Sequence, residues 1–157
     1  MPAFVKGGAA KTPFGKNVYL RSTNGLKFES YTVAASTVRA QTIDGFTGQK
    51  ILQPGTVLAK ITSGVDIGKV GPFHVDGSIT DGRQTAANIV GINDTFLPWQ
   101  LIERDVEVAA LYNGSVVQAN CIEYGGTLTA ATEVALTTAA ALTALQGGTK
   151  GLLIILK

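Results

Sequence analysis

Short apolar runs alternate with turn signals through the middle of the chain. The runs are rich in Val, Ile, Leu and Ala, and they lie at 56–62, 70–75, 86–92, 106–112 and 115–124. Residue pairs that favour turns separate them: Pro54-Gly55, Ser63-Gly64, Asp76-Gly77, Asp81-Gly82 and Asn113-Gly114. Turn signals every 8–12 residues or so between short β-rich runs are typical of small barrels and sandwiches. The pattern therefore predicts a small antiparallel β-barrel or sandwich-like domain.

The N-terminal third has a different pattern. Residues 1–16 show no sustained period, whereas 17–21 and 26–33 are rich in Val, Tyr, Phe and Leu and flank Asn24-Gly25. Asn-Gly between two such runs is a strong hairpin signal. We therefore expect residues 1–50 to form an extended basic arm with a candidate β-hairpin, and residues 51–157 to form one compact β-rich domain.

The last third changes character again. Residues 127–145 are rich in Ala and Thr, place apolar residues at helical spacing and end before Gly147-Gly148. This pattern predicts one C-terminal helix at about 129–145. The segment 151–157 (GLLIILK) then predicts a buried terminal strand. The fold class expected from the whole pattern is mainly β with a single helix.

Charge is distributed unevenly along the chain. Residues 1–60 carry eight Lys or Arg and two Asp or Glu, a net +6, whereas 61–157 carry five and nine, a net −4. A basic N-terminal segment is typical either of a solvated terminus or of an arm that docks on an acidic partner. The basic residues occur singly and without clustered aromatics, which does not favour nucleic acid. No apolar run approaches the ~20 residues of a membrane-spanning helix, so we predict no membrane partner.

Catalytic side chains are scarce. His74 and Cys121 are the single His and the single Cys, and neither lies in a nucleophile motif. We predict a structural His and a buried thiol, no cofactor, no metal centre and no enzymatic activity. Glu103, Asp105 and Glu107 would share one face of a strand, where they could hold calcium or form a solvated acidic face toward a partner. We favour the acidic face.

Five segments form an ordered series with a family resemblance. They are PGTVLAKIT at 54–62, KVGPF at 69–73, DGRQTA at 81–86, IVGI at 89–92 and VAALYNGSVV at 108–117. The series resembles the bacteriophage head-decoration proteins of the lambda type over about residues 51–124. The segment 1–50 is longer than the short arm of that family.

The resemblance implies a structural protein on the outer surface of the virion. It would bind the expanded capsid as a homotrimer, clamp neighbouring major capsid subunits and so stabilise the head. Its N-terminal arm would add a strand to a capsid sheet, a recognised mode of binding. The arm residues expected to bind the capsid are Val18, Tyr19, Leu20, Leu26 and Phe28.

An alternative from another class is a carbohydrate- or cell-surface-binding β module of a phage or bacterial particle. Trp99 and Tyr112 could then act as stacking platforms for sugar rings.

Overall fold

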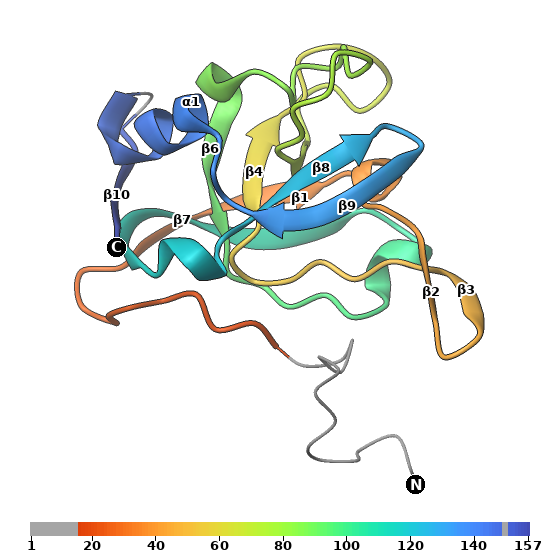
Figure 1. Cartoon of the computed structure of the whole chain (residues 1–157), viewed down its shortest axis with the longest axis horizontal. Coiled ribbons are helices and arrows are strands. Elements are labelled where there is room, and N and C mark those ends of the chain that lie inside the picture. The colour runs from red at the N-terminus through yellow and green to blue at the C-terminus, as the bar shows by residue number, and fades with distance from the viewer. Residues whose placement is uncertain (1–15, 149–150) are drawn as a thin grey trace, which may run out of the picture.

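The protein is a β-rich domain with one short C-terminal helix, as the sequence predicts (Figure 1). The computed structural model describes residues 16–148 and 151–157. The strands are β1 Lys27–Val33, β2 Gln41–Ile43, β3 Phe46–Gln49, β4 Val57–Lys60, β5 Val70–Pro72, β6 Ile89–Asn93, β7 Val106–Val116, β8 Ile122–Thr127, β9 Ala130–Ala135 and β10 Leu153–Leu156. The helix α1 spans Ala139–Thr143 and continues into a π-type turn at Ala144–Gly148.

Five of the strands close into a ring. The hydrogen-bonded order is β1-β5-β4-β6-β7, and β7 also pairs with β1, so the sheet returns to its first strand. The contact between β1 and β5 is parallel, and the other four contacts in the ring are antiparallel. The small antiparallel barrel expected from the spacing of turns is therefore present, with one parallel seam. Closure leaves the ring without a free edge.

The strand β7 is the longest and organises the rest of the molecule. Along one side it pairs with β1 over seven register positions, from Lys27 opposite Asn113 to Val33 opposite Val106. Along the other side it pairs first with β6 and then, in parallel, with β10. In Figure 1, β10 and α1 lie at one side of the molecule, and the β2–β3 hairpin lies at the opposite side.

Two apolar cores lie on opposite faces of β4. Leu58 packs in a cluster with Val33, Val70 and Val108, which come from the other strands of the ring. Its neighbours Val57 and Ala59 pack in a second cluster. The remaining members of that second cluster include Tyr19, Ile92, Leu111, Cys121, Leu136, Leu145 and Ile154. Side chains alternate across a strand, so β4 serves both cores, and the C-terminal elements cover the outer one.

The expected hairpin around Asn24-Gly25 is not formed. Leu20 bridges Val116, and Lys27 pairs with Asn113, so both flanking segments lie against β7 rather than against each other. The residues between them form a loop, with Gly25 at φ +70°. The long β7 offers a partner for both segments, and this tertiary pairing overrides the local turn signal.

The division expected at residue 50 is also absent as a structural boundary. The strand β1 belongs to residues 1–50 and is a full member of the ring. Part of the expected arm, residues 1–15, lies outside the described residues.

The Asn113-Gly114 pair does not turn the chain either. The strand β7 continues through both residues, which pair with Leu153 and Ile154 of β10. A Cβ at Gly114 would lie 2.8 Å from the Leu26 side chain, so glycine here provides room for packing rather than a turn.

The predicted helix at about 129–145 is wrong over most of its length. Residues 130–135 form β9, which pairs antiparallel with β8 from Ile122–Ala135 to Thr127–Ala130, and the helix contains only Ala139–Thr143. The β-branched residues Thr132 and Val134 suit a strand, and Gly126 of β8 has φ +73° at a place where a Cβ would clash with the Ala130 carbonyl of β9. Alanine content alone is a weak helix signal when a partner strand lies adjacent.

Candidate functional site

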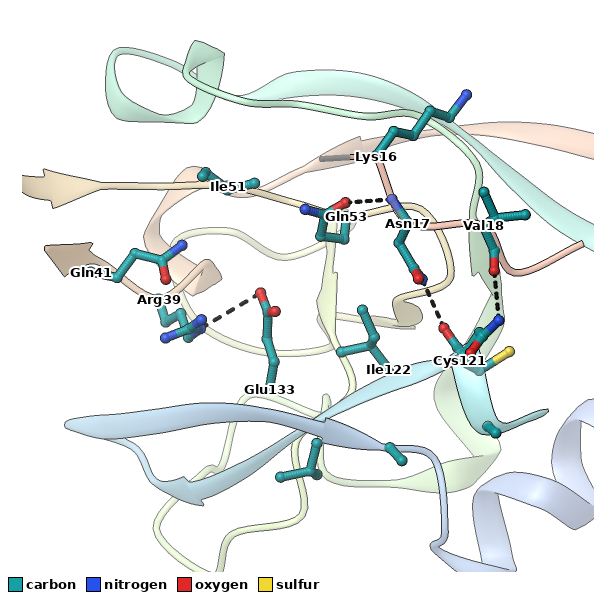
Figure 2. Close-up of a pocket in the computed structure, with 14 residues that line it drawn as sticks. Lys16, Asn17, Val18, Arg39, Gln41, Ile51, Gln53, Cys121, Ile122 and Glu133 are labelled. Carbon is teal, nitrogen blue, oxygen red and sulfur yellow. Dashed lines mark hydrogen bonds and ion pairs between the residues drawn. The ribbon is translucent and has the colours of Figure 1, made fainter. Parts of the chain in front are cut away.

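A groove lies where the described chain begins, at Lys16. Its volume is about 740 Å³, and it is bounded by the first described residues, by β9 and by the turn that precedes β8 (Figure 2). The residues that line it are mostly polar or small: Lys16, Asn17, Val18, Arg39, Gln41, Ile51, Gln53, Ala119, Asn120, Cys121, Ile122, Glu133, Val134 and Ala135.

Asn17 anchors the chain at this groove. Its backbone N–H donates to Oε1 of Gln53 at 3.0 Å, and its amide Nδ2 donates to the carbonyls of Pro54 and Asn120, both at 2.8 Å. Asn120 returns a bond from its own Nδ2 to the Val18 carbonyl at 2.8 Å. These bonds hold the backbone of Asn17 and Val18 against residues 53–54 and Asn120.

Tyr19 adds a second anchor two residues later. Its side chain is only 2% exposed, and its hydroxyl donates to Oδ1 of Asp94 at 2.7 Å. Burial first, and then the hydrogen bond to Asp94, raise the pKa of the Tyr19 phenol well above its usual range. The hydroxyl therefore keeps its proton and acts as a donor.

Gly55 makes the close approach of the anchor possible. It has φ +92°, and a Cβ there would lie 2.8 Å from Asn17 Nδ2 and 2.9 Å from both the Asn120 carbonyl oxygen and Tyr19 Cβ. Only glycine fits the backbone conformation and the space together.

The five predicted arm residues divide between surface and core. Val18 is 71% exposed and lines the groove. Tyr19 is buried, and Leu20 and Leu26 pack against the outer core. Phe28 is 40% exposed but lies in β1, where it pairs with Leu111. Leu20 and Phe28 thus pair with β7 within the protein's own sheet. The sequence alone does not indicate the anchor formed by Asn17 and Tyr19. The Pro54-Gly55 turn, which contacts both residues, is the part of it that the sequence pattern predicts.

Charges of both signs lie in the groove. The Nε of Arg39 is 3.6 Å from Oε1 of Glu133, and it is buried without a hydrogen-bond acceptor. Lys16 lines the same groove. With the amides of Gln41 and Asn120, these groups can bind polar backbone or other hydrogen-bonding ligands.

The residues considered for catalysis lie apart in structural settings. Burial raises the pKa of the Cys121 thiol to about 12, so the thiolate is scarce at neutral pH. His74 is buried, with its Nε2 3.1 Å from the Gly126 carbonyl and its ring edge-on to Tyr124. Among residues 16–148 and 151–157, no group of three or more His, Cys, Asp or Glu side chains could hold a metal ion.

The three acidic residues at 103–107 do not act as one face. Asp105 accepts the backbone N–H of Ala35 at 2.8 Å and pairs with Lys69 Nζ at 2.5 Å. The Lys69 ammonium and the Ala35 N–H hold the pKa of the Asp105 carboxyl below its usual range. Asp105 is thus a bridge between loops, while Glu103 lies at the end of a 3-10 turn outside β7.

Trp99 and Tyr112 have different environments. Trp99 is 62% exposed next to the 3-10 turn at Gln100–Ile102, whereas Tyr112 packs against the outer core from β7. Tyr112, one of the two aromatic side chains expected to stack on sugar rings, is therefore largely covered.

The chain matches no family model, and no curated protein or solved structure was found to be significantly similar to it. Within the described part of the chain, no helix has the length and apolar character needed to cross a membrane.

Proposed function

We propose that the protein is a capsid decoration protein that binds the outer surface of an expanded bacteriophage head as a homotrimer and clamps neighbouring major capsid subunits. The contact would be made by the basic N-terminal segment that precedes the Asn17–Tyr19 anchor. The proposal combines the ordered motif series at 54–117 with the geometry of this anchor.

The anchor is the observation that carries the proposal. Four hydrogen bonds from or to Asn17, Val18 and Asn120, with the Tyr19–Asp94 bond, tie the root of the N-terminal segment to the barrel. A segment that bears load between two bodies needs a firm attachment to one of them. The body of the protein supplies this attachment, because Asn17 bonds to two separate parts of the chain, at 53–54 and at Asn120, and Tyr19 bonds to a third at Asp94.

Charge supports the same assignment. The segment before the anchor contains Lys6 and Lys11, and Lys16 lies at the groove. Basic residues on a docking segment would assist association with an acidic shell and make it sensitive to salt. Many copies on one lattice would also gain from multivalency, so a single contact need not be tight.

The test is co-sedimentation with undecorated, expanded shells of the parent phage. The full chain is compared with a version that lacks residues 1–15, which leaves the anchor and β1 intact. We expect saturation near one copy per capsid subunit for the full chain and loss of binding for the truncated chain, with both proteins folded by circular dichroism. A full chain that stays in the supernatant at every salt concentration would refute the proposal.

A second candidate function is supported by Trp99. Its exposed indole could stack on a sugar ring as part of a surface-binding module. Saturable binding on a glycan panel that is lost in Trp99→Ala would favour this function, and a flat panel would remove it.

A further inference from the structure

A second cavity collects basic side chains. It has a volume of about 300 Å³ and lies between the 3-10 turn at Ala35–Thr37 and the tip of the β8–β9 hairpin at Leu128 and Thr129. Arg39, Lys50, Arg83 and His74 line it. No Asp or Glu is among the described residues that line this cavity.

Lys50 and Arg83 are each held in place by contacts that leave part of their hydrogen-bonding capacity unused. The Lys50 ammonium donates to the Ala35 carbonyl at 2.5 Å. The Arg83 guanidinium donates from Nε to Asp81 at 2.8 Å and from Nη1 to the Pro72 carbonyl at 3.4 Å. An ammonium has three N–H donors and a guanidinium five, so among the described contacts two and three donors remain.

Arg39 adds a third cation on the wall between the cavity and the larger groove, since it lines both. Its backbone N–H donates to the Tyr124 hydroxyl at 3.3 Å. The positive charges of Arg39 and Arg83 both favour ionisation of the Tyr124 phenol, although burial raises its pKa overall. Two guanidinium groups from separate loops therefore act on the same small region.

The cations in this region outnumber their carboxylate partners. Asp81 pairs with Arg83 and Glu133 with Arg39, but in the described residues Lys50 has no ion-pair partner. Arg83 is only 4% exposed and His74 only 1%. Arg83 already has Asp81 and the Pro72 carbonyl as partners, so among the described residues the lining charge without a carboxylate partner is that of Lys50, and an added anion would pair with it.

We propose that this cavity binds a phosphate group between Arg83, Lys50 and Arg39. The inference does not rest on the proposed decoration function. Guanidinium and ammonium donors fit phosphate oxygens, and charge-assisted bonds of this kind are among the stronger ones in proteins. A phosphate group carries more negative charge and more acceptor oxygens than a carboxylate, so donors on three cationic side chains favour it over a carboxylate. The positions of Lys50 and Arg83 are already fixed, so binding requires little reorganisation.

The test is titration of the full chain with inorganic phosphate, followed by calorimetry and by amide NMR at ionic strength held constant with sodium chloride. We expect saturable one-site binding and shifts confined to amides around the cavity, such as Thr37, Thr129 and Ala131. Lys50→Gln should weaken binding about tenfold, the loss expected for one charge-assisted hydrogen bond. The matched control is Lys60→Gln, which removes an exposed cation of β4 and should leave affinity unchanged.

A further variant keeps the test independent of folding. Leu128 is half-exposed at the hairpin tip, so Leu128→Glu adds a carboxylate at the rim without removing a core contact, and it should also weaken binding. Comparison of inorganic phosphate with ribose 5-phosphate distinguishes a free ion from a phosphate carried on a larger molecule, and binding of either supports the site. The proposal is overturned if neither binds saturably, if acetate binds as tightly as phosphate, or if the Lys50 and Lys60 variants lose affinity equally.

Discussion

The hydroxyl of Tyr19 donates a 2.7 Å hydrogen bond to Asp94, a residue 75 positions later in the chain. Asp94 directly follows β6, and its backbone N–H donates to the Ala109 carbonyl of β7 at 2.8 Å. The bond therefore connects the root of the N-terminal segment to the β6–β7 pair. Because Asp94 is already fixed by β7, Tyr19 gains a rigid acceptor.

Loss of this bond should destabilise the protein measurably. Tyr19→Phe keeps the ring in the outer core but removes the donor to a carboxylate, which we expect to lower the free energy of unfolding by about 1.5 kcal/mol. Urea unfolding followed by circular dichroism measures the change. Tyr112→Phe is the matched control, since among the described contacts the Tyr112 hydroxyl has no hydrogen bond, and it should change stability by less than about 0.5 kcal/mol. Equal losses in the two variants would argue against the Tyr19–Asp94 bond as the cause.

Gly55 and Gly64 form a natural pair for testing the anchor. Their φ angles are +92° and +88°, but a Cβ at Gly55 would meet Asn17, Asn120 and Tyr19 within 2.9 Å, whereas nothing lies within 4 Å at Gly64. Gly64→Ala should cost only the backbone strain, about 1 kcal/mol. Gly55→Ala should cost about 1–3 kcal/mol more, because it forces the anchor apart. Thermal unfolding measures the loss of stability in each variant. Equal losses would show that the contacts of Asn17, Asn120 and Tyr19 around Gly55 can shift without destabilising the protein.

Local sequence signals predicted the central strands well. The runs at 56–62 and 70–75 contain β4 and β5, and the runs at 86–92 and 106–112 overlap β6 and β7, which end at Asn93 and Val116. Their β-branched and apolar residues are bounded by turns, and most of these turns depend on glycine at positive φ, as at Gly55, Gly64 and Gly82. Where the apolar pattern and the turn residues agree, the local sequence is sufficient to predict the position of a strand.

Long-range pairing could not be predicted in the same way. The Asn24-Gly25 and Asn113-Gly114 pairs are identical dipeptides, yet one lies in a loop beside β7 and the other lies within β7. Their outcomes depend on which strand is adjacent, and a single sequence does not specify this. The Asn17 anchor was missed for the same reason, since its partners Gln53, Pro54 and Asn120 are far away in the chain.

Thr138, the residue before α1, donates a hydrogen bond to a buried carboxylate of β8. Its hydroxyl donates to Oε1 of Glu123 at 2.7 Å, and Glu123 is only 6% exposed. Thr138→Val preserves the shape but leaves the carboxylate short of a donor, so we expect a loss of about 2 kcal/mol in unfolding free energy by urea titration. The control is Thr143→Val, whose exposed hydroxyl only donates to the Ala139 carbonyl of the same helix and should matter little. A similar loss in both variants would contradict a special role for Thr138.

The Cys121 thiol should be unreactive in the folded protein. Its pKa is raised by burial from 9.0 to about 12, so at pH 8 the thiolate fraction falls about a thousandfold relative to the unfolded chain. Alkylation by iodoacetamide at pH 8 should therefore be much slower for the native protein than for the protein in urea. Rapid labelling of the native state would show that the thiol is accessible.

The same shift gives Cys121 a defined effect on stability at high pH. Between pH 9 and about 12 the folded state retains a thiol proton that the unfolded state loses, so stability must fall as pH rises through this range. The contribution is constant below pH 9 and declines above it by up to about 1.4 kcal/mol per pH unit. Cys121→Ala removes this group while leaving every tyrosine and lysine in place. The difference in unfolding free energy between wild type and variant should therefore be flat from pH 6 to 8 and decrease between pH 9 and 10.5. A difference that stays flat to pH 10.5 would mean that the thiol ionises in the folded protein as readily as in the unfolded chain, in conflict with its burial beside Val116 and Leu136.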